Sequence, residues 1–194
     1  MWRQVQRLLR RKLSSADLSR VQDAFELAWA VHRDQLRDDG SPYMLHPLRV
    51  IEILVSEFGF SHPGVIQAAL LHDVLEDHPN LSTAAVGERF GPAVVSIVTE
   101  LTKPRRGDRG RDEVTQAYFG ALVTSSERAR IIKLADKLDN VRDAVNSPDP
   151  AKRARTRRDA RKLFRLLCPT LEDRAMAGRI AAALAAGLAS GEGD

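Results

Sequence analysis

The chain has 194 residues, 43% of them hydrophobic and 29% charged, which is the composition of a soluble globular protein. We expect a single domain over residues 1–194, because this length suits one hydrophobic core and no apolar run reaches the roughly 20 residues that cross a bilayer. The single cysteine, Cys168, excludes an internal disulfide framework and fits a cytoplasmic location. Aromatic residues are scarce at 5%, so the net charge of +4 does not indicate a nucleic-acid interface.

Apolar residues recur with a period near 3.6 along most of the chain, and no segment alternates with period 2, so the sequence predicts an all-α fold. A short basic amphipathic helix is expected at the N-terminus, and residues 191–194 are expected to fray. Pro47 in a first turn, Ser82 before a helix and Gly91-Pro92 between two helices mark recognisable ends. The other helices are expected over residues 16–37, 48–58, 64–77, 83–90, 92–101, 112–123, 127–145, 151–167 and 171–188.

The most informative segment is apolar over residues 65–75 and carries the pair His72-Asp73 followed one turn later by Glu76-Asp77. In one continuous helix these four ionisable groups share a single patch. Burying unpaired carboxylates is costly, so a cation is expected beside them, and a metal ion is the simplest candidate. An ordinary core pair between His72 and Asp73 is the alternative.

Other polar residues could complete such a site. His46 precedes Pro47 at the start of an apolar helix, which would fix the direction of its ring, although a capping or packing role is also open. The remaining histidines are expected on the surface or in loops: His32, His62 and His78.

A second polar stripe lies in the apolar segment 131–145, where Asp136, Asn140 and Asp143 follow at i, i+4 and i+7. Lys133 precedes Asp136 by one turn. Pairing with Lys137 or Arg142 would account for Asp139 and for Asp143, but it accounts less well for Asp136. Two imidazoles and two carboxylates without a thiolate would suit Mn²⁺, Fe²⁺ or Zn²⁺ better than Ca²⁺. The candidate ligands are His46, His72, Asp73 and Asp136.

Taken in order, the segments 43–47, 68–77, 90–91 and 133–143 resemble the HD-domain superfamily. The resemblance is closest to the hydrolase domain of the RelA/SpoT alarmone enzymes and to the small alarmone hydrolases. It implies an HD-type helical bundle with a core at about residues 20–146, followed by C-terminal helices at about 151–188. Only 49 residues follow Val145, so we expect a hydrolase without a synthetase domain, and the C-terminal helices could support a homo-oligomer.

The resemblance also implies roles for individual residues. One divalent ion, Mn²⁺, would be held by His46, His72, Asp73 and Asp136, while Glu76 and Asp77 would orient and deprotonate the attacking water. Arg37 would pack on the purine, Asn140 would contact the sugar, and Asp143 would lie in the same substrate-binding stripe. The implied reaction removes the 3′-pyrophosphate of ppGpp or pppGpp and returns GDP or GTP.

This chain departs from the family pattern at Asp38, where a lysine usually follows the purine-packing arginine. A carboxylate there would repel a polyphosphate. We expect Arg33, or the loop that bears Arg105, Arg106, Arg109 and Arg111, to compensate. The late basic segment 152–165 is expected to be a solvated helix face.

Two other functions remain open from the sequence. The chain could be an HD phosphohydrolase that acts on another nucleotide, such as the 2′-phosphate of NADPH. Alternatively, it could be a noncatalytic nucleotide sensor, although such a sensor would not require Glu76 and Asp77.

Overall fold

The computed structural model describes residues 1–78 and 80–189, and its regular elements there are all helical, which confirms the predicted all-α fold. The expected frayed tail, residues 191–194, lies outside the described ranges. The elements are α1 (Trp2–Leu9), α2 (Ser15–His32), α3 (Leu45–Glu52), the π-helix η1 (Ile53–Glu57), α4 (Pro63–Leu71), α5 (Val74–Asp77), α6 (Thr83–Phe90), α7 (Pro92–Leu101), α8 (Arg111–Val123), α9 (Glu127–Asp143), the 3₁₀ turn η2 (Ala144–Asn146), α10 (Pro150–Leu167), η3 (Cys168–Thr170) and α11 (Arg174–Ala189).

Several helix ends follow directly from local side-chain chemistry. Ser14, Ser82 and Ser126 occupy N-cap positions, where each hydroxyl accepts a hydrogen bond from the backbone N–H three residues later. Gly91 has a φ of 86°, a conformation open to glycine, and Pro92 then opens α7. The predicted boundary between α6 and α7 is therefore confirmed.

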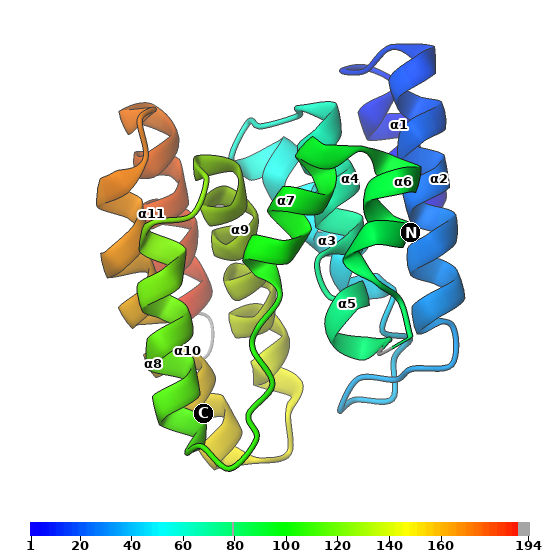
Figure 1. Cartoon of the computed structure of the whole chain (residues 1–194). Helices are drawn as coiled ribbons and strands as arrows, with labels where there is room; N and C mark the ends of the chain where they lie inside the picture. Colours follow the sequence, from blue (N-terminus) through cyan, green and yellow to red (C-terminus); the bar gives the residue numbers. More distant parts are fainter. Residues whose placement is uncertain (79, 190–194) are drawn as a thin grey trace.

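The long helix α9 lies at the centre of the bundle (Figure 1). It packs against α3, α4 and α7 on one side and against α8, α10 and α11 on the other. Its apolar positions are almost completely buried. Of the polar stripe predicted on α9, Asp136 is buried, whereas Asn140 and Asp143 are partly exposed. No helix in the described part of the chain is long and apolar enough to cross a membrane.

The prediction that one helix runs from residue 16 to residue 37 was wrong at its end, because α2 ends at His32. A tight loop follows, in which the Asp39 side chain accepts from the Ser41 N–H at 2.9 Å and Gly40 adopts a φ of 79°. The Arg37 N–H donates to the Ser41 carbonyl within this loop. Arg37 therefore comes from a loop rather than from the last turn of a helix.

The segment 64–77 is also not the continuous helix that was predicted. α4 ends at Leu71, Asp73 has a φ of −104°, and the single-turn helix α5 begins at Val74. The predicted helix 48–58 instead begins at Leu45 and widens into the π-helix η1. The earlier start places His46 inside α3.

Cys168 is partly buried, and burial raises the pKa of its thiol to about 11. A raised pKa makes this thiol a poor nucleophile near neutral pH.

Candidate functional site

Three buried side chains from different helices converge on one point. His46 of α3, His72 at the end of α4 and Asp136 of α9 each offer a ligand atom, and these atoms lie within 4.8 Å of one another. Nε2 of His46 is 3.2 Å from Oδ1 of Asp136, and Nε2 of His72 is 3.9 Å from the same oxygen. Such spacings suit donors that share one ion at about 2.1 Å.

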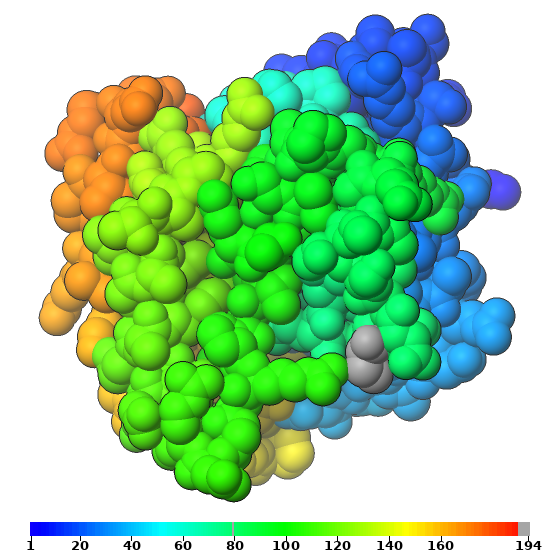
Figure 2. All heavy atoms as spheres, viewed as in Figure 1, coloured from blue at the N-terminus to red at the C-terminus, as the bar shows by residue number. Residues whose placement is uncertain are grey.

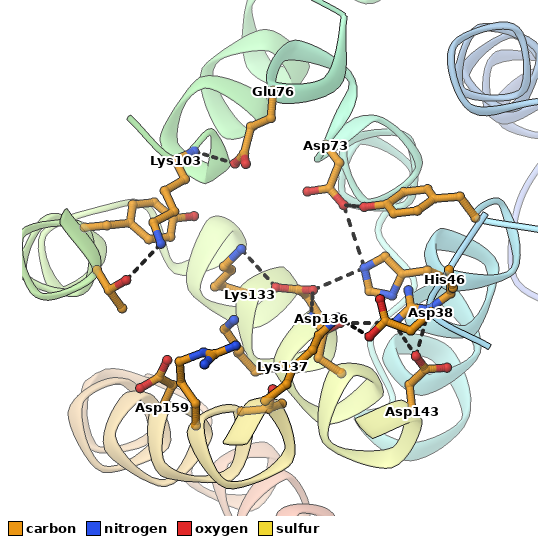
Figure 3. A pocket seen from close by; sticks show the side chains of 18 of the residues that line it. Asp38, His46, Asp73, Glu76, Lys103, Lys133, Asp136, Lys137, Asp143 and Asp159 are labelled. Carbon is orange, nitrogen blue, oxygen red and sulfur yellow. Dashed lines mark hydrogen bonds and ion pairs between the residues drawn. The ribbon is translucent and has the colours of Figure 1, made fainter. Parts of the chain in front are cut away.

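The fourth predicted ligand, Asp73, lies beside this cluster. Its Oδ2 is 3.0 Å from Nε2 of His72 and 3.8 Å from Nε2 of His46. The Tyr43 hydroxyl donates a 2.5 Å hydrogen bond to the same oxygen. Figure 3 shows the carboxylates of Asp73 and Asp136 both directed toward the same nitrogen of the His46 ring. The structure thus brings the four predicted ligands together, with Asp73 outside the tightest group of three.

Two polar atoms in the cluster have unmet bonding capacity. Within the described chain, Nε2 of His72 and Oδ2 of Asp136 are buried without a hydrogen-bond partner of suitable geometry, although the ammonium of Lys133 lies 2.9 Å from the second atom as an ion-pair partner. Nδ1 of His72 donates to the Ala69 carbonyl at 2.8 Å, which leaves Nε2 as the acceptor that faces the cluster. Unpaired buried acceptors are costly, and a cation would satisfy both atoms. Together with the imidazole and carboxylate donors, this arrangement fits a divalent metal ion.

Without such an ion, Lys133 supplies the compensating charge. Its Nζ lies 2.9 Å from Oδ2 of Asp136, one helical turn away, as the sequence predicted. Burial by itself would raise the pKa of Asp136, but Lys133 and His46 hold that pKa well below its usual range. Burial would lower the pKa of His46, but its hydrogen bonds to Asp136 and Asp139 raise it to about 9.

A cavity of about 410 Å³ opens above the cluster. His46, Asp73 and Asp136 lie in its wall, and Glu76 faces them from α5 (Figure 3). In the space-filling view, the loop 102–110 forms the lower edge of the visible face, in green (Figure 2). The cavity is large enough to receive a small molecule that reaches the cluster.

The two predicted catalytic carboxylates occupy different positions. Among the described residues, Glu76 lines the cavity and Asp77 does not. Glu76 accepts a short hydrogen bond from the Lys103 N–H. Removal from water and the nearby charge of Asp73 raise the pKa of Glu76, and the same two causes raise the pKa of Asp77. Both carboxyls are therefore better proton acceptors near neutral pH than free carboxylates.

The prediction that His32 lies on the surface was wrong, because this side chain is only 2% exposed. Its Nδ1 is 2.7 Å from Oε1 of Gln35 and 3.6 Å from Oδ2 of Asp77, and its ring packs against that of Tyr43. His32 thus lies beside Asp77 on one side and packs on the other against Tyr43, the hydrogen-bond donor to Asp73. His62 and His78 are exposed, as predicted.

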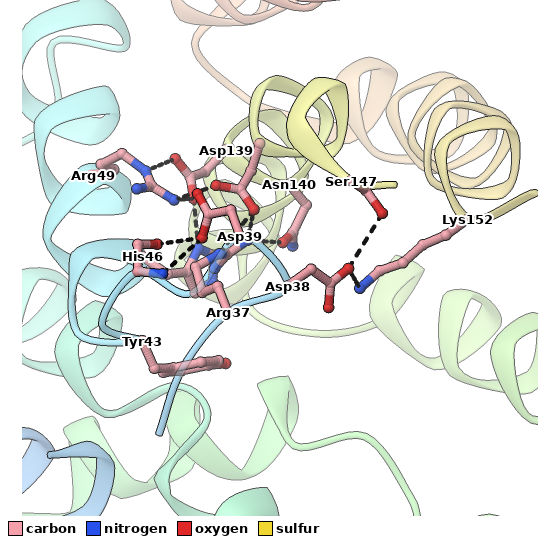
Figure 4. Close-up of polar contacts among 12 residues, drawn as sticks. Arg37, Asp38, Asp39, Tyr43, His46, Arg49, Asp139, Asn140, Ser147 and Lys152 are labelled. Carbon is pink, nitrogen blue, oxygen red and sulfur yellow. Dashed lines mark hydrogen bonds and ion pairs between the residues drawn. The ribbon is translucent and has the colours of Figure 1, made fainter. Parts of the chain in front are cut away.

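The predicted substrate residues Arg37, Asn140 and Asp143 form one hydrogen-bonded group (Figure 4). Nε of Arg37 donates to Oδ2 of Asp143 at 2.8 Å, and Nη2 of Arg37 donates to Oδ1 of Asn140 at 3.3 Å. Asn140 in turn donates to Oδ1 of Asp136 at 2.6 Å. The Arg37 guanidinium is therefore held in a fixed position beside the cluster.

The expectation that Lys137 or Arg142 pairs with Asp139 was wrong. Asp139 instead accepts hydrogen bonds from His46 at 2.7 Å and from Arg49 at 2.6 Å. Arg142 points away from the pocket and forms a two-point ion pair with Glu57. The true partner of Asp139 lies 90 positions earlier in the chain, so spacing along α9 could not reveal it.

Besides Arg37 and Lys133, basic residues from four parts of the chain line the cavity, and of these only Arg111 was expected near the phosphates from the sequence. Burial lowers the pKa of Lys137, and also that of Lys103, whose Nζ donates to Thr115 at 2.9 Å. The late basic helix is not merely a solvated face, since α10 contributes two of these side chains. The set comprises Lys103, Arg111, Lys137, Lys152 and Arg155.

Asp38 is not left as an isolated negative charge in the pocket. It forms an ion pair with Lys152 of α10 and accepts a hydrogen bond from Ser147 at 3.3 Å (Figure 4). Both contacts lower the pKa of Asp38, with Lys152 as the main cause. Arg33 does not compensate as expected, because it is exposed and paired with Asp34.

Of the four loop arginines that were expected to compensate, only Arg111 lines the cavity among the described residues. Arg106 and Arg109 donate instead to carbonyls of their own loop, at Arg109 and Arg105. The compensating charge therefore comes mainly from α10, which lies more than 100 positions after Asp38.

Residues 24–171 match the family model described as HD domain. The chain belongs to the HD-domain family. The matched range of this HD-domain protein includes α10, which carries Lys152 and Arg155 into the pocket.

Similar proteins agree with this assignment. The chain is 40% identical over 136 residues to the fruit-fly (Drosophila melanogaster) protein named guanosine-3′,5′-bis(diphosphate) 3′-pyrophosphohydrolase MESH1, covering 67% of this chain and 73% of the relative. It is 38% identical to the pyrophosphohydrolase of the same substrate from Aquifex aeolicus, covering 63% of this chain but 17% of that longer protein. A solved structure described as a metazoan SpoT orthologue that hydrolyses ppGpp superimposes with a TM-score of 0.75 at 31% identity, over 91% of this chain and 98% of that one.

Proposed function

We propose that this chain hydrolyses the 3′-pyrophosphate of ppGpp or pppGpp, releasing pyrophosphate and returning GDP or GTP. One observation carries the proposal: a buried His-His-Asp cluster and a carboxylate with a raised pKa face each other across a single pocket lined with basic residues. The MESH1 proteins and the solved SpoT orthologue, which resemble this chain over most of its length, are named for that reaction.

The metal in this proposal is one Mn²⁺ ion, held by His46, His72, Asp136 and Asp73. These four side chains offer nitrogen and oxygen donors without a thiolate, a set that suits Mn²⁺. Bound there, the ion supplies Lewis acidity that polarises a phosphoryl group and acidifies water. The ion also offsets the mutual repulsion of Asp73 and Asp136 in the buried cluster.

The remaining steps are assigned to residues around the pocket. A water oxygen bonds to phosphorus, the bond from phosphorus to the ribose 3′-oxygen breaks, and the 3′-oxygen leaves as a hydroxyl after it takes a proton from solvent water. Glu76, supported by Asp77, receives the proton that the water loses. Arg37 packs on the purine from its fixed position, Asn140 contacts the sugar, and Asp143 holds Arg37.

The basic lining accounts for recognition of a polyphosphate. A substrate with two diphosphate groups carries several negative charges, and cations at the wall of a partly enclosed pocket attract it strongly. Burial lowers the pKa values of Lys103 and Lys137, and a phosphate partner would stabilise the charged form of both side chains.

The proposal is tested with a substrate panel of ppGpp, pppGpp, NADPH and ordinary nucleotides, each with Mn²⁺ and with a chelator. We expect pyrophosphate release from ppGpp and pppGpp with Mn²⁺, and loss of that release with the chelator. Phosphate release from NADPH alone would instead support a phosphohydrolase for another nucleotide. Nucleotide binding without any turnover would support a sensor.

A separate prediction concerns the Asp38–Lys152 pair. Lys152→Met should raise the KM for ppGpp several-fold and change kcat little, because it leaves Asp38 as an uncompensated negative charge beside the phosphates. Adding Asp38→Asn should restore most of the affinity, as steady-state kinetics would reveal. Equal KM values for the native protein and for Lys152→Met at low salt would show that the pair does not affect binding.

A further inference from the structure

The predicted metal ligand His46 and the predicted base-binding residue Arg37 belong to one closed circuit of hydrogen bonds. His46 and Arg49 lie one turn apart on α3, and α9 presents Asp139 and Asp143 to them, also one turn apart. The circuit is buried at its centre, where Asp139 is 2% exposed. Neither Asp139 nor Arg49 lines the cavity above the cluster among the described residues.

The first half of the circuit fixes the ring of His46. Oδ2 of Asp139 lies 2.7 Å from Nδ1 of His46, and a carboxylate can only accept, so Nδ1 carries the proton. In the neutral ring Nε2 is then left as the acceptor, and this atom lies 3.2 Å from Oδ1 of Asp136. Asp139 therefore selects the tautomer that a metal ligand needs and holds the ring at the required angle.

The second half runs through Arg49 to Arg37. The Arg49 guanidinium donates to both oxygens of Asp139, at 2.6 and 3.1 Å, and to Oδ1 of Asp143 at 3.0 Å. The other oxygen of Asp143 accepts from Arg37 at 2.8 Å. Figure 4 shows Arg49 and His46 beside Asp139, with Arg37 and Asn140 next to them. Asn140 closes the circuit between Arg37 and Asp136.

From this geometry we propose that Asp139 and Arg49 are positioning residues that couple the metal centre to the nucleotide base. Asp139 sets the ring of His46 for the metal. Arg49 shares its planar fork between Asp139 and Asp143, so the same side chain also sets the position of Arg37. The inference rests on the proposed function for its metal and nucleotide, but its first readout, metal affinity, needs no substrate.

The test begins with apoprotein prepared by chelation and uses Mn²⁺ alone as the probe, with free Mn²⁺ followed by electron paramagnetic resonance. Asp139→Asn replaces the carboxylate by a neutral amide that can also donate, and it should weaken Mn²⁺ affinity by about 10- to 100-fold, the usual effect of changing the partner of a ligating histidine. An affinity within twofold of the native value in a folded Asp139→Asn protein would overturn the role of Asp139.

Arg49→Met tests the second half of the circuit. This variant is less prone to misfold than the buried Asp139→Asn variant, because the Arg49 side chain is 29% exposed. It should raise the KM for ppGpp several-fold with a smaller change in kcat, and Arg49→Lys should restore only part of the affinity because lysine cannot bridge two carboxylates as a fork. An unchanged KM in Arg49→Met would overturn the link to Arg37.

The matched control is Arg142→Met, which removes another partly exposed arginine that ties α9 to a neighbouring element through a carboxylate. It should leave both Mn²⁺ affinity and KM unchanged. Similar losses in Arg142→Met and Arg49→Met would mean that any ion pair between these helices has the same effect, which contradicts the proposal. If Asp139→Asn weakens Mn²⁺ binding and the native protein cleaves no ppGpp, the proposed substrate is refuted and the positioning role of Asp139 stands.

Discussion

Glu76→Gln is expected to lower the turnover of ppGpp by about 10²- to 10⁴-fold while leaving Mn²⁺ affinity close to the native value. Glu76 is the predicted catalytic carboxylate that lines the cavity, and it faces the cluster from the opposite wall. Glutamine keeps the size of the side chain and can still accept the hydrogen bond from the Lys103 N–H. It cannot receive a proton from water, so the change isolates that step.

The measurements are single-turnover pyrophosphate release and Mn²⁺ titration of the same preparation. Glu88→Gln is a suitable control, because Glu88 is an exposed residue of α6 outside the cavity lining given by the described residues. A Glu76→Gln protein that turns over at more than a tenth of the native rate would remove Glu76 from the role of proton acceptor. A simultaneous loss of Mn²⁺ binding would indicate that Glu76 is instead part of the metal centre.

Most helices could be predicted from the sequence, because their periodicity and their ends are local properties. The caps at Ser82 and Gly91-Pro92 are examples, since each depends on residues within one turn. The break after Leu71 could not be predicted in this way, because residues 65–71 are apolar except for Gln67 and favour a continuing helix. Successive residues of a continuous helix point about 100° apart, but α4 ends at Leu71, so His72 and Asp73 both lie in the turn before α5 and can face one point.

The site was predicted at the level of residue types but not of partners. His46, His72, Asp73 and Asp136 were identified because their residue types and order resemble a family pattern. Long-range pairs leave no such signal, and the pair between Asp38 and Lys152 spans 114 positions.

The burial of His32 could have been predicted from its position on α2. Val21, Ala24 and Ala28 are buried at helical spacing on α2, and His32 follows four residues later on the same face. A polar residue that continues an apolar stripe is buried and needs a partner, which Gln35 and Asp77 provide here. The same reasoning applied to Asp139, on the apolar face of α9, would have called for a cation from another helix.

The second large effect is expected at Asp136, which contacts both the proposed metal and Lys133. Asp136→Asn should abolish measurable Mn²⁺ binding and ppGpp turnover, because it removes one of the three closest ligand groups. It should also destabilise the apoprotein by about 3–5 kcal/mol, the usual cost of leaving one member of a buried ion pair alone. Lys133 is 7% exposed, so its ammonium would have little access to water.

These two consequences can be separated with a second substitution. Lys133→Met/Asp136→Asn should recover most of the stability to urea, since the unpaired ammonium is gone, but it should not recover Mn²⁺ binding or turnover. Lys133→Met alone should keep Asp136 in its contacts with His46 and Asn140 and should still bind Mn²⁺. A double variant as unstable as Asp136→Asn would contradict the assignment of Lys133 as the internal counter-charge. With that assignment, Lys133 supplies the positive charge that offsets Asp136 in the buried cluster, and a bound metal would add to it.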